Sequence, residues 1–159
     1  MEFNIREAQV TDMPEVLKLI NDLAVFEKEP DAVEVTVKDL EQDGFGDNPA
    51  FKCFVAVTNK TVQGIAIIYN RYSTWKGKII HLEDLIVNEA YRHQGIGTAL
   101  LNEVVKYASS IKAKRINWEV IDWNEPAISF YESKGATVMR DWDVVQLNEQ
   151  GIKNYLSNI

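Results

Sequence analysis

The chain has 159 residues, of which 46% are hydrophobic and 26% charged, as expected of one compact domain with a substantial core. Its formal net charge of -7 argues against nucleic acid and anionic membranes as partners and favours cationic substrates. The sequence shows neither a secretion signal nor an apolar run long enough to span a bilayer, so we expect a single domain over residues 1–159 in the cytoplasm.

The first predicted elements are a strand and a helix. Apolar and polar residues alternate from Phe3 to Arg6, as in a half-buried strand. Thr11 or Asp12 then stands where a helix cap is needed, and Glu15 follows Asp12 at the spacing of a capping box. Apolar residues at helical spacing indicate the face turned to the core: Met13, Val16, Leu17, Ile20, Leu23 and Ala24.

An acidic segment follows this helix. From Glu27 to Glu34 the carboxylates are offset only by Lys28. Such a segment is either a solvated loop or a rim that recognises cations. Thr36 can then cap a short helix through Glu41.

Three strand-like runs come next. The runs from Phe51 to Thr58 and from Val62 to Tyr72 predict an antiparallel hairpin, and the run from Lys78 to Val87 predicts the third strand of a meander. The single cysteine, Cys53, lies in the first run. It has no partner for an internal disulfide, and we expect it to be buried.

The third run contains an anomaly. Its apolar residues are typical of a buried central strand, yet Glu83 and Asp84 interrupt them. Burial of carboxylates costs several kcal/mol unless they are paired or hydrogen-bonded, so this acidic pair requires an explanation. We expect a β-bulge beside a polar cleft.

A glycine loop from Tyr91 to Thr98 separates this strand from an amphipathic stretch that ends at Ile111. Gly95 and Gly97 allow a tight turn whose N–H groups point outward at a helix N-terminus, where anions are favoured. No lysine follows Gly97, so the loop is not of the Walker type, and Leu100 stands where a dinucleotide fingerprint needs its third glycine. The alternative to a phosphate site is an ordinary strand-to-helix turn.

The remaining elements are a strand from Lys114 to Val120, a helix that starts at Asn124, a last strand from Trp142 to Leu147, and a last helix from Glu149 to Leu156. Asn124 serves as the cap of its helix, and Gly135 ends it. Tyr131 lies on the same helical face as the cap, either as a half-buried core aromatic or as a functional group. His81 and His93 have no partner at metal-ligand spacing, so we expect no metal.

Four separated motifs together resemble the GNAT superfamily of acetyl-CoA-dependent N-acetyltransferases, and within it the diamine (spermidine/spermine and thialysine) acetyltransferase group. The resemblance covers nearly the whole chain. The motifs are Lys38-Asp39-Leu40 with Asp43-Gly44-Phe45-Gly46, Leu82-Glu83-Asp84-Leu85-Ile86-Val87, Tyr91-Arg92 through Gly95-Ile96-Gly97, and Trp123-Asn124-Glu125-Pro126 with Phe130-Tyr131 and Gly135-Ala136.

The resemblance implies an α/β (α+β) fold with a mixed, mostly antiparallel central sheet flanked by helices. The sheet splays open between the strand ending at Val87 and the strand from Lys114, with acetyl-CoA as co-substrate in the gap. A homodimer is also implied. The implied acetyl-CoA contacts are Leu85, Ile86 and Val87 for the pantetheine arm and thioester, Arg92, His93, Gln94, Gly95, Ile96, Gly97 and Thr98 for the pyrophosphate, and Asn124 at its helix cap.

Chemistry and the resemblance together assign catalytic roles. A protonated amine is not nucleophilic until it loses a proton, and Glu83, in a partly desolvated cleft, is the best candidate to accept that proton directly or through water. A backbone N–H beside Leu85 can stabilise the developing oxyanion. The resemblance gives Tyr131 the task of protonating the leaving CoA sulfur.

The acceptor predicted from the resemblance is a small cationic amine: a polyamine, a diamine or a lysine-like amino acid. By position, Phe26 and Glu27 match residues that line the amine channel of the family, and Glu83 and Asp84 add negative charge deeper in. Trp118 and Glu119 also lie near the acceptor, at positions where the animal enzymes have apolar residues. The alternatives are acetylation of a protein N-terminus or lysine, and a catalytically silent acyl-CoA-binding regulator, against which the joint presence of Glu83 and Tyr131 argues.

Overall fold

A computed structural model describes residues 2–159 as two compact units. The first extends to Glu119, and the second runs from Val120 to Ile159. Each unit is described by itself below. That residues 1–159 form one domain stays a prediction. Within residues 2–159, none of the helices combines the length and the apolarity that a bilayer crossing requires.

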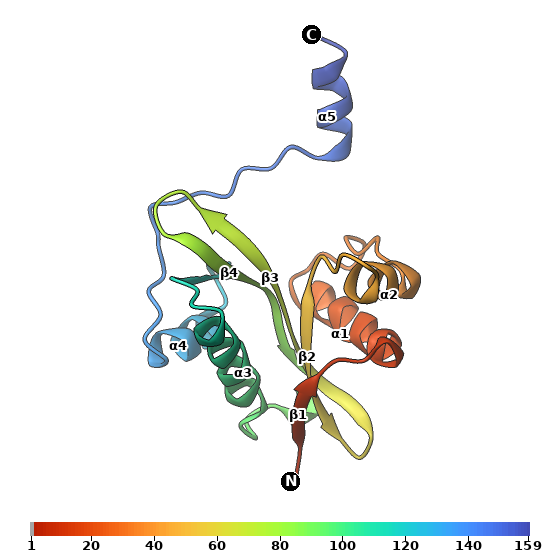
Figure 1. Cartoon of the computed structure of the whole chain (residues 1–159), viewed down its shortest axis with the longest axis vertical. Coiled ribbons are helices and arrows are strands. Elements are labelled where there is room, and N and C mark those ends of the chain that lie inside the picture. Colours follow the sequence, from red (N-terminus) through yellow and green to blue (C-terminus); the bar gives the residue numbers. More distant parts are fainter. Residues whose placement is uncertain (1) are drawn as a thin grey trace. The chain divides into compact units, whose positions relative to one another are not determined.

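The first unit is built on a five-stranded sheet in the order β1-β2-β3-β4-β5 (Figure 1). Its first three strand pairs are antiparallel, and the last pair, β4 with β5, is parallel. The mixed, mostly antiparallel sheet is therefore confirmed. The strands are β1 (Asn4–Glu7), β2 (Lys52–Thr58), β3 (Thr61–Ser73), β4 (Gly77–Val87) and β5 (Ile116–Asn117).

Helices cover both faces of this sheet. Helices α1 (Met13–Phe26) and α2 (Val37–Phe45) lie on one face, and α3 (Ile96–Ser110) lies on the other (Figure 1). Short 3-10 turns, η1 (Val10–Asp12) and η2 (Glu89–Tyr91), precede α1 and the glycine loop. The core on the α1 side joins the buried residues of α1 to inward side chains of the strands: Met13, Val16, Leu19, Cys53, Val55, Ile65, Ile67 and Ile86.

Gly64 lets α3 approach the end of β4 closely. It pairs with Val87, and a Cβ atom at this position would lie 3.1 Å from the Ile86 carbonyl oxygen and 3.1 Å from side-chain atoms of Ile96 and Leu100. A side chain here would push the first turn of α3 away from the sheet. The glycine therefore fixes where the loop before α3 is presented.

The second unit contains helices α4 (Glu125–Ser133) and α5 (Glu149–Leu156). Asn124 caps α4 as predicted, with its Oδ1 accepting a hydrogen bond from the Ala127 N–H at 3.4 Å. Gly135 follows the helix with φ of +88°, a left-handed conformation that favours glycine. The predicted end of this helix is thus confirmed.

Three local predictions are wrong. The strand expected from Lys114 to Val120 is only β5, since its pairing with β4 covers two residues. Trp142 to Leu147 has no strand structure. Glu15 forms no capping box, because its carboxylate accepts a hydrogen bond from the Val62 N–H at 2.8 Å.

Asp12 ties β1 to the start of α1. Its carboxylate accepts two hydrogen bonds from the Arg6 guanidinium, at 2.7 and 2.9 Å, and a third from the Gln9 N–H at 2.7 Å. The hydrogen bonds from Arg6, followed by that from Gln9, hold the pKa of Asp12 below its ordinary value. A carboxyl with a depressed pKa stabilises the fold above its unfolded pKa and loses this contribution as the pH falls.

We expect Asp12→Asn to lower the free energy of unfolding at pH 7 by about 1 to 3 kcal/mol, because a buried charge-assisted bidentate contact is lost. The difference from wild type should shrink as the pH falls from about 4, the unfolded pKa, through the lower pKa of the folded carboxyl, below which wild-type Asp12 is also protonated. Urea titrations at several pH values measure it. Asp22→Asn is the matched control, since the Lys18–Asp22 pair is exposed and should contribute less than about 0.5 kcal/mol. Equal effects of the two substitutions would contradict the role given to Asp12.

Candidate active site

The acidic pair of β4 lies at a β-bulge, as the sequence predicts. Asp84 pairs with Ile67 of β3, and Leu82 pairs with Ile68, so two consecutive residues of β3 stand opposite three residues of β4. Glu83 is the additional residue. The bulge resolves the anomaly of two carboxylates in an otherwise apolar strand.

The bulge turns Glu83 and Asp84 to the same face of the sheet. Paired residues of antiparallel strands share a face, and so do residues two apart on one strand. Tyr69 and Ile67 therefore share a face of β3, and their partners His81 and Asp84 share it on β4. Glu83 joins them, since its Oε2 lies 3.5 Å from Nε2 of His81. Without the additional residue, neighbouring carboxylates would point to opposite faces.

Asp84 and Glu27 have raised pKa values, as expected of carboxylates in a partly desolvated acidic cluster. Burial, followed by the negative charges of Glu83 and Glu27, raises the pKa of Asp84 to about 6. Burial also raises the pKa of Glu27, the residue that ends α1. The structure therefore brings together three of the predicted acceptor-site residues, which lie far apart in the sequence.

Glu83 has neighbours that sequence analysis missed. The His81 ring lies between Glu83 and Arg71, with Nδ1 3.5 Å from an Arg71 guanidinium nitrogen. Tyr69 stacks on His81, with ring centroids 5.0 Å apart. From the sequence, only the i, i+2 spacing of His81 and Glu83 on a strand could have indicated that these two side chains share a face. The position of Tyr69 beside His81 depends on the register between β3 and β4, which the sequence does not show.

The glycine loop has the geometry that an anion site requires. Gly95 is the N-cap of α3 with φ of +86°, and a Cβ atom there would meet nothing within 4 Å. At Gly97 a Cβ atom would meet only the Val87 side chain, at 3.8 Å. The first turn of α3, which includes Ile96, Gly97 and Thr98, carries no acidic side chain. Its N–H groups are thus compatible with a bound phosphate.

Arg92 connects this loop to the predicted acceptor residues. Its Nε donates a hydrogen bond to the Val87 carbonyl at 3.1 Å, and its guanidinium lies 5.7 Å from the centre of the Phe26 ring. Gln94 donates a hydrogen bond to the Ala90 carbonyl at 3.4 Å, and His93 has a left-handed φ of 60°. The end of α1 and the glycine loop therefore meet.

One edge of β4 is open where the resemblance places the pantetheine arm. On its β3 side, Leu85, Ile86 and Val87 pair with Ala66, Ile65 and Gly64. On its other side, β5 pairs only with Ile80 and His81, and the described residues give β4 no further strand partner there. The backbone from Leu82 to Val87 can therefore hydrogen-bond an extended ligand on that side.

The other predicted site residues lie at the end of the first unit and in the second. Trp118 and Glu119 follow β5, and the charge of Glu119 contributes to a raised pKa of Tyr69, after burial and Glu83. Asn124 and Tyr131 belong to the second unit. Tyr131 is 9% exposed, and burial raises its pKa to about 12. Its hydroxyl therefore keeps its proton at neutral pH.

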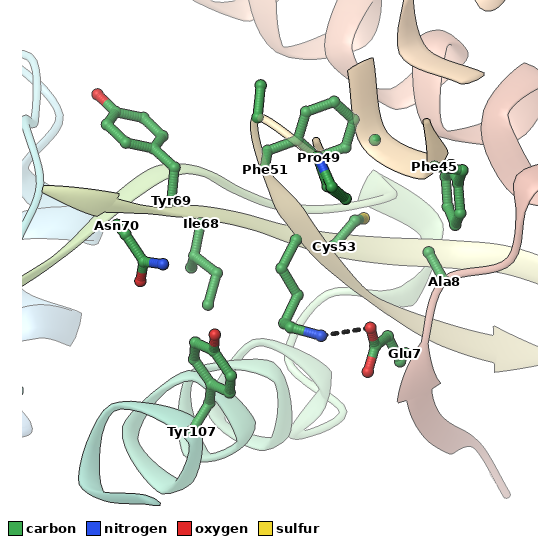
Figure 2. A pocket seen from close by; sticks show the side chains of 13 residues that line it. Glu7, Ala8, Phe45, Pro49, Phe51, Cys53, Ile68, Tyr69, Asn70 and Tyr107 are labelled. Atoms are coloured by element: carbon green, nitrogen blue, oxygen red, sulfur yellow. Dashed lines mark hydrogen bonds and ion pairs between the residues drawn. The ribbon is translucent and has the colours of Figure 1, made fainter. Parts of the chain in front are cut away.

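A surface cavity of about 270 Å³ in the first unit involves none of the predicted site residues. The Lys52–Glu7 ion pair, Phe51 and Tyr107 are among the residues that line it (Figure 2). Figure 2 shows Tyr69 and Phe51 on one side of the β2–β3 ribbon and Tyr107 on the other. Tyr69, which lines the cavity, also contacts His81. No three His, Cys, Asp or Glu side chains of residues 2–159 gather as a metal-ligand set.

Comparison with known proteins identifies the family. The family model described as "Acetyltransferase (GNAT) family" matches residues 13–136. The chain belongs to the GNAT acetyltransferase family. It is thus an acyltransferase, and the family implies acetyl-CoA as its co-substrate.

Sequence relatives agree with this assignment, and a solved structure shares the fold. The chain is 37% identical over 158 residues to "Spermidine/spermine N(1)-acetyltransferase-like protein 1" of Homo sapiens, aligning 93% of its own length with only 23% of that protein. It is 37% identical over 140 residues to "Thialysine N-epsilon-acetyltransferase" of Mus musculus, covering 83% of this chain and 82% of that one. An integron cassette protein from Vibrio cholerae shares the fold, with a TM-score of 0.80, 21% identity and 98% of both chains covered.

The raised pKa of Asp84 makes the acidic cluster destabilising at neutral pH. A carboxyl whose folded pKa lies above its unfolded value binds more protons in the folded state, so stability falls as the pH rises from about 4 to about 6. We expect Asp84→Asn to raise the free energy of unfolding by about 1 to 3 kcal/mol at pH 7.5 and by much less at pH 4. Chemical denaturation at both pH values measures this.

Asp47→Asn, at an exposed carboxylate, is the control and should show no such pH dependence. If Asp84→Asn destabilises the protein equally at both pH values, the cluster does not act as described.

Proposed function

We propose that this acetyltransferase transfers the acetyl group of acetyl-CoA to a primary amine of a small cationic acceptor. The acceptor class is a polyamine, a diamine or a lysine-like amino acid. The observation that carries the proposal is the convergence of Glu27, Glu83 and Asp84, which the β4 bulge and the end of α1 bring into one electrostatic cluster. Such a cluster favours a ligand that brings its own positive charge.

Two features of the first unit support acetyl-CoA as the donor. The glycine loop at the start of α3 offers backbone N–H groups and no acidic side chain in the first turn, which suits a pyrophosphate. The open edge of β4 from Leu82 to Val87 offers backbone groups to the amides of the pantetheine arm. We assign the remaining contacts to Arg92, His93 and Gln94 of the loop and to Asn124 at the cap of α4.

The proposed chemistry gives each catalytic side chain one proton to move. Glu83 accepts a proton from the acceptor ammonium, directly or through water, which frees the nitrogen lone pair. The amine nitrogen attacks the thioester carbonyl carbon and forms a tetrahedral intermediate, whose collapse breaks the C–S bond. The nitrogen releases its surplus proton to solvent as the amide forms, and solvent restores the proton that Tyr131 gives up. We assign to a backbone N–H beside Leu85 the stabilisation of negative charge on the carbonyl oxygen. Tyr131, whose raised pKa keeps its proton in place, donates it to the departing sulfur.

The names of the relatives support the acceptor class. The chain is 37% identical to proteins named for spermidine/spermine and for thialysine, all of them amines with more than one nitrogen. Phe26 and Glu27 at the end of α1, with Trp118 and Glu119 after β5, are the proposed rim of the acceptor site. We expect Trp118 and Glu119 to give this chain a different preferred amine from that of the animal enzymes, which have apolar residues at these positions.

We also propose a homodimer in the cytoplasm. The segment before α5 is rich in exposed apolar side chains, with Val144 60%, Val145 92% and Leu147 60% exposed. An apolar segment of this kind is a surface that a second copy can cover.

A screen of amines with acetyl-CoA, following release of free thiol, tests the proposed function. We expect spermidine, diamines and lysine-like amino acids to be acetylated in preference to an alkylamine of matched length with one nitrogen. Added salt should raise KM more for the polycations, because it screens their attraction to the acidic cluster. Equal turnover of spermidine and the simple alkylamine, without salt dependence, would contradict the acidic site.

Glu27→Gln sharpens this screen. It should raise the KM of spermidine by about two- to fivefold, the equivalent of about 0.4 to 1 kcal/mol, and leave that of the simple alkylamine unchanged. Glu34→Gln, at an exposed carboxylate of the same acidic segment, is the control. If both substitutions act alike, the segment is a solvated loop and not a rim.

Tyr131→Phe tests the proton donor. The substitution keeps the ring and removes only the hydroxyl, so the melting temperature and the affinity for CoA should change little, while kcat falls about 10²- to 10⁴-fold. Phe130 contacts Tyr131 with the ring planes tilted by 59° and the centroids 5.4 Å apart, and Phe130→Leu serves as the control for a loss of packing alone. If Tyr131→Phe keeps the wild-type kcat, Tyr131 is not the proton donor and its role is structural.

A further inference from the structure

A buried histidine connects Glu83 to a cation on the neighbouring strand. His81 is 6% exposed, whereas the Glu83 side chain is 54% exposed. The two ring nitrogens of His81 face different groups: Nε2 lies 3.5 Å from Glu83 Oε2, and Nδ1 lies 3.5 Å from a guanidinium nitrogen of Arg71. The exposed Glu83 carboxylate thus lies next to a buried His81 ring.

The arrangement determines which nitrogen of His81 carries the proton. A guanidinium can only donate hydrogen bonds, so Arg71 requires an unprotonated Nδ1. The neutral ring then carries its single proton on Nε2, the nitrogen that faces the Glu83 carboxylate. The protonated nitrogen of His81 therefore faces Glu83, 3.5 Å from its Oε2.

Tyr69 fixes the plane of the His81 ring. The two residues are direct cross-strand partners of β3 and β4, and their rings stack with an interplanar angle of 28°. Burial, followed by the charge of Glu83 and a hydrogen bond with it, raises the pKa of Tyr69. The tyrosine therefore keeps its hydroxyl proton beside the same carboxylate.

We propose that His81 is a positioning residue for Glu83: its Nε2–H holds the carboxylate in one orientation, Arg71 selects the required tautomer, and Tyr69 fixes the ring. This inference rests on the proposed function, in which Glu83 accepts the proton of the amine. Glu83 is the additional residue of the bulge and has no partner residue on β3, so side-chain contacts must orient its carboxylate. A base held in place performs better than one that rotates freely, because the orientation is established before the reaction.

The tautomer can be measured without any activity. In a protein labelled with 15N in its two histidines, the signals absent from His81→Phe belong to His81. At pH 8 we expect a protonated Nε2 and an unprotonated Nδ1. The Nε2 resonance should move in Glu83→Gln and stay in place in Asp84→Asn, the adjacent carboxylate. A protonated Nδ1, or an Nε2 resonance unaffected by Glu83→Gln, would overturn the proposal.

Kinetics test the consequence for catalysis. His81→Phe keeps the ring that stacks on Tyr69 and removes the donor, and we expect kcat to fall about 10- to 100-fold, with the KM for the amine within about twofold of wild type. His81→Gln places an amide N–H near the position of Nε2 and should recover most of the loss. A wild-type kcat in His81→Phe, or a change in KM alone, would overturn the proposal.

A double-mutant cycle distinguishes positioning through Glu83 from a separate effect. In Glu83→Gln, the further change His81→Phe should reduce kcat by less than about twofold, because the group to be positioned is already gone. Independent, additive losses would contradict the proposal. If the wild-type protein acetylates no amine, the proposed function fails, and the nitrogen spectrum still decides whether His81 donates to Glu83.

Discussion

The additional residue in β4 is the constraint on which the rest of the site depends. A strand paired in regular register would turn Glu83 and Asp84 to opposite faces, leaving one carboxylate within the packing of α3 against the sheet. The β-bulge instead puts both on the face where α1 ends, together with His81 and Tyr69. Burial, followed by the charges of Glu83 and Glu27, raises the pKa of Asp84 to about 6, so the cluster carries an electrostatic cost at neutral pH. The proposed cationic acceptor would relieve this cost.

The donor side of the site depends on backbone rather than on side chains. Gly64 brings α3 close to β4, Gly95 starts the helix in a left-handed conformation, and β4 keeps one edge open beyond His81. These features offer backbone groups of the kind that phosphate and amide groups can hydrogen-bond. The acceptor side, as proposed, depends on the carboxylates and the side chains that contact them.

Local patterns predicted much of the fold. The hairpin, the glycine loop, the cap at Asn124 and the bulge were all readable from the sequence, because each depends on residues close together in the chain. The short length of β5 and the lack of strand structure from Trp142 to Leu147 were not, because strand structure depends on hydrogen bonds to a neighbouring strand. Glu15 was misassigned for the same reason, since its partner Val62 is 47 residues away. Of the site, the carboxylates and the loop were predicted, whereas the contact of Tyr69 with His81 required the register of β3 and β4.

The most direct test of the account is the turnover number of Glu83→Gln with acetyl-CoA and a polyamine, measured against Asp84→Asn in the same assay. If Glu83 accepts the proton, Glu83→Gln should lose about 10²- to 10⁴-fold in kcat while retaining the affinity for CoA, and Asp84→Asn should change mainly the KM of the amine. A Glu83→Gln enzyme with a kcat close to that of wild type would contradict the central claim that the bulge exists to present this carboxylate to the amine.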